Sequence, residues 1–206
     1  MPKLKIGPGR LSFPQLFERG SEEYGSKYGT SLLLPPDTDL VPIRHALLEA
    51  AIEKWGKDKD KWPKLKATPK TVIKDATEKD FAGYEKGWHY INLSSKDQPG
   101  VVDQHLREVL QEAEAYPGRW ALCSVNAYAW ANNFGKGVSL GLNNVMLLQD
   151  DDNLSGKPRA KDDFEEWAKE LPEDAPGSDF AEDDDDEVPD QPDEKSDGKK
   201  HDDWGD

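Results

Sequence analysis

Two apolar-rich stretches, 120–131 and 138–148, flank the connection Asn132-Asn133-Phe134-Gly135-Lys136-Gly137. Asparagine and glycine tolerate the positive φ angles that a hairpin connection needs. From Trp120 onward, large or polar residues alternate with small apolar ones, as expected of a strand whose side chains point to opposite faces. This pattern predicts a long antiparallel β-hairpin, around which the rest of the fold has to be built.

The two faces of the first of these strands differ in size and polarity. One face carries Trp120, Leu122, Ser124, Asn126, Tyr128 and Trp130, and the other carries Ala121, Cys123, Val125, Ala127, Ala129 and Ala131. Small apolar side chains suit the crowded interior of a small barrel. The rings and amides are then expected to point elsewhere.

The remaining elements are shorter. Pro35 and Pro36 end a strand, and apolar residues recur at helical spacing behind Pro42. We expect strands over 10–13, 27–34 and 87–93, a β-prone run over 71–75, helices over 42–55, 101–115 and 162–171, and a lysine-rich loop over 56–69. This order predicts a mainly β fold with inserted helices (α+β), a five-stranded, partly open barrel of the oligonucleotide-binding (OB) type.

Charge divides the chain unevenly. Of the formal charge of −15, residues 1–149 carry 20 Lys and Arg against 18 Asp and Glu, and residues 150–206 carry 7 against 24. Beyond Pro172 the composition is dominated by Asp, Glu, Pro, Gly and Ser, which is typical of disorder. We therefore predict a folded domain over 1–171 and a disordered acidic tail over 172–206.

Several function classes find little support. One cysteine, Cys123, excludes an internal disulfide and a cysteine-based zinc site. The histidines at 45, 89, 105 and 201 lack metal spacing, and neither a phosphate-binding glycine loop nor a nucleophile elbow is present. A calcium-loop pattern starting at Asp151 ends in Asp162 rather than Glu and is broken by Pro158. We expect no metal, no cofactor, no catalysis and no membrane span, and a reducing cytoplasm as the setting.

The outward rings instead indicate binding of a nucleic-acid strand, because rings stack on bases of any sequence while nearby lysines attract phosphates. The alternative for each ring is that it packs beneath a helix. The candidate contact residues are Lys27, Lys74, Trp88, Tyr90, Lys96, Arg119, Trp120, Tyr128, Trp130, Phe134 and Lys136.

Several short motifs are recognisable. They are Arg10-Leu11-Ser12-Phe13-Pro14, Ile91-Asn92-Leu93-Ser94-Ser95, Pro99-Gly100-Val101-Val102-Asp103, Tyr116-Pro117-Gly118-Arg119-Trp120, Asn126-Ala127-Tyr128, Lys136-Gly137-Val138 and Gly141-Leu142-Asn143-Asn144-Val145. In this order, over roughly residues 6–165, they resemble a family of phage single-stranded DNA-binding proteins. The resemblance implies an OB fold, sequence-tolerant binding without catalysis, and a role in phage DNA replication or recombination inside the bacterial host. Tyr128 and the Lys136 loop match the family pattern directly.

Two other functions compete with this interpretation. An acidic DNA mimic or interaction scaffold would use the tail to occupy the basic groove of another protein. A metal-dependent nucleic-acid enzyme would use the cluster of Asp150 to Asp152.

The tail has two predicted roles. As a tethered polyanion it would compete with DNA for the groove, and Trp204 and Asp206 near its end would bind replication or recombination proteins of the phage or host. Duplex DNA is a further possible partner of the folded domain.

Overall fold

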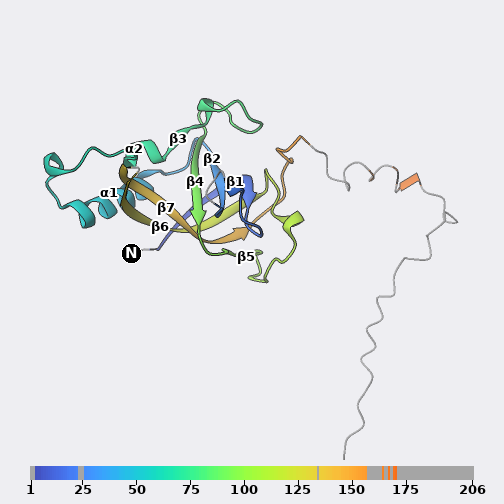
Figure 1. Cartoon of the computed structure of the whole chain (residues 1–206). Coiled ribbons are helices and arrows are strands. Elements are labelled where there is room, and N and C mark those ends of the chain that lie inside the picture. The colour runs from blue at the N-terminus through green and yellow to red at the C-terminus, as the bar shows by residue number, and fades with distance from the viewer. Residues whose placement is uncertain are drawn as a thin grey trace, which may run out of the picture. The chain divides into compact units, whose positions relative to one another are not determined.

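The β6–β7 hairpin is the longest ladder in the computed structural model, which describes residues 3–22, 26–133 and 135–156 together with Phe164, Trp167, Lys169 and Glu170 (Figure 1). Strands β6 (Trp120–Asn132) and β7 (Gly135–Leu147) pair from Ala121 with Leu147 to Asn132 with Gly135, with one bulge. The predicted hairpin is therefore confirmed.

Five strands close into a barrel. Besides β6 and β7 these are β1 (Lys3–Gln15), β2 (Tyr28–Leu34) and β4 (His89–Ser95). They follow the order β4-β2-β1-β6-β7, and a parallel pairing of β4 with β7, at Ser94 and Gly141, closes the circle. The predicted five-stranded OB-type barrel with inserted helices is confirmed, and it is closed. Strand β3 (Lys74–Asp75) extends the sheet beside β4, and β5 (Gly100–Val102) extends it beside β7.

The barrel interior selects small side chains on β6. Ala121, Cys123, Val125 and Ala127 are at most 4% exposed. Leucine, isoleucine and valine from the other strands fill the space opposite them, including Leu11, Leu32, Leu34, Ile91, Leu93, Val138 and Leu140. The inward face predicted from the alternation of β6 is therefore correct over these four positions.

Helix α1 (Val41–Trp55) covers one end of the barrel, as Figure 1 shows, and the loop after it lies at the same end. Pro42 lies in its first turn, and Gly56 ends it at φ 85°, a conformation that glycine adopts readily. Its buried residues are Ile43, Ala46, Leu47, Ala50 and Ala51. The helix predicted over 42–55 is confirmed.

The helix predicted over 101–115 is wrong. Gly100–Val102 is strand β5, paired in parallel with Asn144–Met146 of β7, and Glu112–Glu114 is a single 3-10 turn. Between them the Asp103 carboxylate accepts hydrogen bonds from the backbone N–H groups of His105 (2.8 Å) and Arg107 (2.9 Å). Such side-chain bonds compete with a helix for the same N–H groups. The helical spacing of apolar residues was coincidental, since Leu106 and Leu110 are 70% and 75% exposed.

The β-prone run over 71–75 is also shorter than expected. Pro69–Val72 forms the one-turn helix α2, which begins with a reciprocal capping box between Thr68 and Thr71. Only Lys74 and Asp75 pair with β4, opposite Tyr90 and His89.

A second, smaller apolar cluster lies outside the barrel. Leu33, Ala76, Tyr84 and Tyr90 form it, because the segment 76–88 folds back over the outward side of β2 and β4. Leu32, Leu33 and Leu34 are consequently all fully buried, which explains the continuous apolar run. This cluster decides which part of the outer surface stays open.

The predicted helix over 162–171 lies mostly outside the described residues, although Phe164, Trp167, Lys169 and Glu170 are helical. Contacts divide the chain into two units, 1–159 and 160–206. The predicted tail over 172–206 lies outside the described residues. None of the described helices has the length and apolarity needed to cross a membrane.

The Cys123 thiol should be inert in the folded protein. Burial raises its pKa to about 12, and only the thiolate is nucleophilic. A thiol-specific disulfide reagent near neutral pH should therefore label the native chain far more slowly than the chain in denaturant. Equal labelling rates in the two states would show that the β6 interior is not closed.

Candidate nucleic-acid interface

An open polar strip runs across the outward side of β1, β2 and β4. Residues paired across neighbouring strands share a face, and the register places Ser31 opposite Asn92 and Gly29 opposite both Gln15 and Ser94. We call these five residues the polar strip. Asn92 and Gln15 are exposed and the other three are half-buried. A Cβ on Gly29 would lie 2.4 Å from the Leu93 carbonyl oxygen, so glycine keeps this part of the strip low.

Exposed rings border the strip on the side of the second cluster. Phe13 and Phe81 are 55% and 49% exposed, and their rings meet edge to face with centroids 5.2 Å apart. Phe81 in turn contacts Tyr84, at 5.6 Å. Tyr84 donates a hydrogen bond to Ser12 Oγ (3.2 Å), and this bond ties the segment carrying Phe81 to β1. The pair thus presents two aromatic surfaces on a fixed support.

Cations stand at the other end of the strip. A third ring, Tyr28, lies next to it at the start of β2 but points to the inward side, because Tyr28 alternates with the outward Gly29 and Ser31. Tyr28 pairs with Ser95 at the end of β4, and the Arg19 guanidinium lies 5.4 Å from the Tyr28 ring centroid. Arg19 also donates to the Lys96 carbonyl oxygen at 3.2 Å. The predicted contact residues Lys27 and Lys96 are both exposed here. This end of the strip can therefore offer positive charge to a strand that lies along it.

The hairpin carries a second group of predicted residues. Tyr128 and Trp130 point outward from β6, opposite Ser139 and Gly137, and both are half-exposed. The Trp130 ring lies over Gly137, where a Cβ would approach it to 2.8 Å. Lys136 is exposed near the tip, while Phe134 lies outside the described residues.

Two lysines extend this face along β1. Lys5 lies opposite Ser124 and Lys3 opposite Asn126, so both lysines share the outward face of Tyr128. Both are exposed. These lysines were not among the predicted contact residues, because the first strand was expected over 10–13, and β1 begins seven residues earlier, at Lys3.

Trp88 and Trp120 are brought together, with Arg10 between them. The Arg10 guanidinium carbon lies 5.4 Å from each ring centroid, and the rings are 6.2 Å apart. Asp151 binds both Arg10 and Trp120. Arg10 Nη2 lies 2.5 Å from Asp151 Oδ2, and Trp120 Nε1–H donates to the same oxygen at 2.6 Å. The inner faces of both rings are thus occupied by a protein cation, so only their outer faces can meet a base.

Arg119 has a similar acidic partner. It donates to Asp150 Oδ1 (2.7 Å) and twice to the Leu148 carbonyl oxygen (3.1 and 3.0 Å). Asp150 also accepts from the Tyr116 hydroxyl at 2.6 Å. The sequence Tyr116-Pro117-Gly118-Arg119-Trp120 therefore fastens the end of β7 to the start of β6.

Tyr90 and Lys74 lie on the covered part of the outer surface. Tyr90 is 3% exposed and its ring packs against Tyr84, at 5.3 Å. Lys74 stands over the same ring at 5.3 Å. Burial raises the pKa of the Tyr90 phenol. Tyr90 therefore packs inside the protein instead of facing solvent, and we leave it out of the proposed contact surface.

The described residues offer no metal centre, since no group of three His, Cys, Asp or Glu among them is arranged to hold an ion. Asp150 and Asp151 point their carboxylates at arginines instead. Asp162, the last position of the calcium-loop pattern, lies outside the described residues.

The exposed pair of Phe13 and Phe81 and the cation of Arg10 were not predicted as contact residues from the sequence. Phe13 adopts a positive φ of 48°, which turns it away from the strand. No local pattern predicts that Phe81, which is separated from Phe13 by 67 residues, contacts it. Arg10 was assigned only to a strand. Its motif, Arg10-Leu11-Ser12-Phe13-Pro14, could have indicated a role, because Arg10 is the one cation in it.

We predict that Asp151→Asn lowers the free energy of unfolding by about 1–3 kcal/mol near neutral pH, because it leaves the largely covered Arg10 without its carboxylate. Partial burial tends to raise the pKa of Asp151, but hydrogen bonds from Asp152 N–H and Trp120 and the Arg10 charge outweigh it and lower that pKa below 3.8. The carboxylate therefore stabilises the fold above about pH 3.8, and the effect disappears as the pH falls through the lower folded-state pKa.

Urea unfolding of wild type, Asp151→Asn and the exposed neighbour Asp152→Asn over a pH series measures this. The gap between wild type and Asp151→Asn should close in acid. A gap that is equally large for Asp152→Asn would mean that the Arg10 contact contributes nothing specific.

Comparison with known proteins places this arrangement in a family. Residues 2–176 match the sequence profile described as Enterobacter phage Enc34, ssDNA-binding protein. The single-stranded DNA-binding protein from bacteriophage Enc34, solved in complex with ssDNA, is similar with 23% identity and a TM-score of 0.59 over 73% of this chain and 88% of that chain.

A C-terminal truncation of the same phage protein is 24% identical, with a TM-score of 0.58 over 73% of this chain and 88% of that chain. The single-stranded DNA-binding protein gp2.5 encoded by bacteriophage T7 is 16% identical, with a TM-score of 0.50 over 85% of this chain and 97% of that chain. No curated protein matched the chain. At these identities the solved structures show a shared fold, whereas the profile covers most of the sequence. The chain belongs to the Enc34 family of phage ssDNA-binding proteins.

Proposed function

We propose that this chain binds single-stranded DNA with little sequence preference along the polar strip, and that it acts in phage DNA replication or recombination in the cytoplasm of the infected cell. The observation that carries the binding proposal is the strip itself, a low polar surface between the exposed Phe13–Phe81 pair and the exposed cations Arg19, Lys27 and Lys96. In OB folds this face, across the second and third barrel strands, is where oligonucleotides bind.

Each part of the strip has a physical role in this proposal. Phe13 and Phe81 stack on unpaired bases, which contributes about 1–3 kcal/mol per base and works with any base. Arg19, Lys27 and Lys96 attract phosphates, and Asn92 and Ser31 offer hydrogen-bonding groups to the strand. The chemistry needs no cofactor and breaks no bond, so the protein is a binding protein and not an enzyme.

The β6–β7 hairpin is a second contact region in this proposal. The β6–β7 connection corresponds in strand order to the loop between the fourth and fifth strands of an OB fold, which also contributes to oligonucleotide binding. Tyr128 and Trp130 supply rings there, and Lys136 supplies a charge. Trp88, Trp120, Arg119 and Lys74 remain secondary candidates, because each already has a protein partner.

Phe81→Ala should weaken oligothymidine binding to the full chain by about 1–3 kcal/mol, through the loss of one stacking surface. Leu110→Ala is the matched control, since it also removes an exposed apolar side chain (75% exposed) but follows Val109, which is hydrogen-bonded to Val101 of β5 and not to a strand of the strip. Quenching of the tryptophan fluorescence over a salt series reports the affinity. Duplex DNA of the same length, measured alongside, should bind more weakly because its bases are already stacked.

Two results would contradict the binding proposal. Equal affinities of Phe81→Ala and Leu110→Ala would remove the aromatic pair from the interface. Absence of any salt-sensitive binding of oligothymidine would instead favour the acidic DNA mimic, which needs no DNA site of its own.

The acidic tail gives this proposal a regulatory part. Residues 172–206 carry 16 Asp and Glu against 3 Lys and Arg. A flexible tether holds such a segment at an effective concentration of millimolar order, so weak attraction suffices for it to compete with DNA. Trp204 and Asp206 at its end would serve as the contact for replication or recombination proteins.

Deletion of residues 172–206 should raise the affinity for oligothymidine, most at low salt, where charges are screened least. Trp204→Ala in the full chain should leave DNA affinity nearly unchanged, because it removes no charge. If the truncated and full chains bind equally at low salt, the tail is not a competitor.

A further inference from the structure

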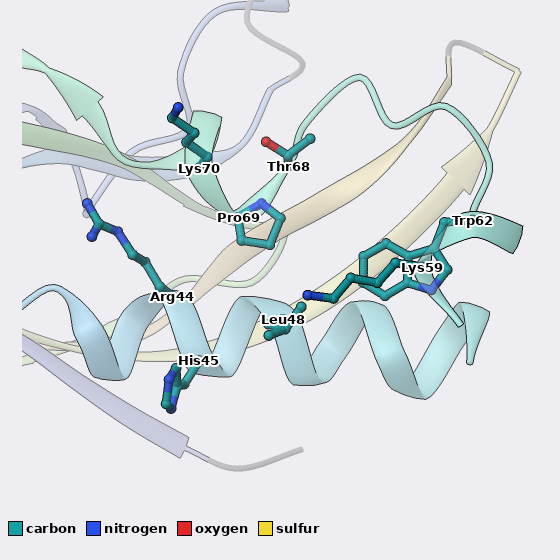
Figure 2. Close-up of a pocket in the computed structure, with 8 residues that line it drawn as sticks. All are labelled: Arg44, His45, Leu48, Lys59, Trp62, Thr68, Pro69 and Lys70. Carbon is teal, nitrogen blue, oxygen red and sulfur yellow. The ribbon is translucent and has the colours of Figure 1, made fainter. Parts of the chain in front are cut away.

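A basic cavity of about 530 Å³ lies beside α1, at the end of the barrel that this helix covers. Its lining comes from three segments: Arg44, His45 and Leu48 of α1, Lys59 and Trp62 of the following loop, and Thr68, Pro69 and Lys70 at α2. Figure 2 shows Lys59 and Trp62 at one end of the gap between α1 and Pro69, and Arg44 and Lys70 at the other end. The volume is that of a site for a small organic group.

The charges around this cavity are sorted by sign. Three permanent cations, Arg44, Lys59 and Lys70, line it, and no carboxylate is among its lining residues. The acids of α1, Glu49 and Glu53, instead line a separate, smaller hollow next to Ala127. The ligand that fits the larger cavity is therefore an anion.

An aromatic wall adds a second requirement. The indole N–H of Trp62 is already satisfied, since it donates to the Gly56 carbonyl oxygen at 2.8 Å. One side of the ring packs against Trp55, with centroids 6.1 Å apart. Trp62 also borders the cavity together with Leu48 and Pro69. A flat apolar group carrying an anion, as in a nucleotide, matches both the ring and the cations.

The segment that leads into the cavity lining is hydrogen-bonded to the hairpin near its tip. Lys66 N–H donates to the Lys136 carbonyl oxygen at 2.7 Å, and Val138 N–H donates to the Ala67 carbonyl oxygen at 2.9 Å. The chain then passes directly from Ala67 into Thr68, Pro69 and Lys70 of the cavity lining. Four residues span at most about 14 Å, so Lys70 is close to the end of the proposed interface that Lys136 marks.

We propose that a DNA single strand leaving the hairpin tip continues past Lys66 into this cavity, where Trp62 faces a base and Arg44, Lys59 and Lys70 bind phosphates. The proposal rests on the proposed function, and it extends the binding path from the barrel strands to the helix-covered end. The lysine-rich loop over 56–69 thereby gains a role as a second contact segment for longer strands.

The test is the dependence of affinity on strand length. Oligothymidines from about 4 to about 20 nucleotides span the range of OB footprints. They are titrated into wild type, into Lys59→Ala/Lys70→Ala, and into Lys79→Ala, which removes an exposed lysine outside the cavity. Both cavity lysines are exposed, and circular dichroism together with urea unfolding checks that the double variant remains folded.

The expected result is unchanged affinity of the double variant for the shortest strands that bind, and a loss on the order of tenfold for the longest. The slope of log K against log salt should fall by about 1.4 for long strands only, because two phosphate contacts are lost at about 0.7 each. Lys79→Ala should follow wild type at every length.

Three outcomes would overturn the proposal. Superimposable wild-type and double-variant affinities at every length would remove the cavity from the strand's path. A loss of equal size at every length would place both lysines in the primary footprint rather than in an extension. If the double variant bound an acidic peptide more weakly than wild type but bound oligothymidine of every length equally well, the cavity would be a docking site for a protein. Failure of wild type to bind any oligothymidine would contradict the proposed function itself, and is recognisable as such.

Discussion

The narrow interior of the barrel is the constraint on which the rest of the structure depends. Five strands leave room for only small side chains on one face of β6, and Ala121, Cys123, Val125 and Ala127 meet that limit. Because side chains alternate along a strand, the larger residues of β6 must then point outward. The surface that meets a partner is therefore set by the same alternation that packs the core.

The outer surface is divided by a second packing event. The segment 76–88 covers Leu33 and Tyr90 and leaves Ser31, Asn92 and Gly29 uncovered, so one barrel face carries both an apolar satellite core and an open polar strip. Phe81 stands at the boundary, where the covering segment meets the strip. Packing of Tyr84 and Tyr90 thus supports an exposed ring in a defined position, as a stacking surface requires.

Ion pairs fix side chains at the end of β7, as ring packing does at the polar strip. Asp150 and Asp151 hold Arg119 and Arg10, and so fix the start of β6 and the two tryptophans around Arg10. Cations with greater exposure are present at the polar strip, at the hairpin and in the lining of the cavity beside α1. The total charge of −15 conceals this, because residues 150–206 carry most of the acids. A polyanion partner is compatible with the folded part of the chain once the two parts are counted separately.

Features that repeat along the chain were determined by the sequence alone. The alternation from Trp120, the helical spacing behind Pro42 and the separation of charge are local patterns, and the hairpin, α1 and the barrel class follow from them. Contacts between distant segments were decided only by the tertiary structure. Pairing of Val101 and Val102 with β7, together with the Asp103 turn, replaced a helix that spacing alone favoured. Tyr90 became buried because the segment 76–88 folds over it, and Phe13 met Phe81 for the same reason. The loop over 56–69 reached the hairpin through backbone bonds from Lys66 and to Ala67. In each case the conformation is stabilised by contacts with a segment far away in the sequence. A pattern of neighbouring residues cannot reveal such contacts.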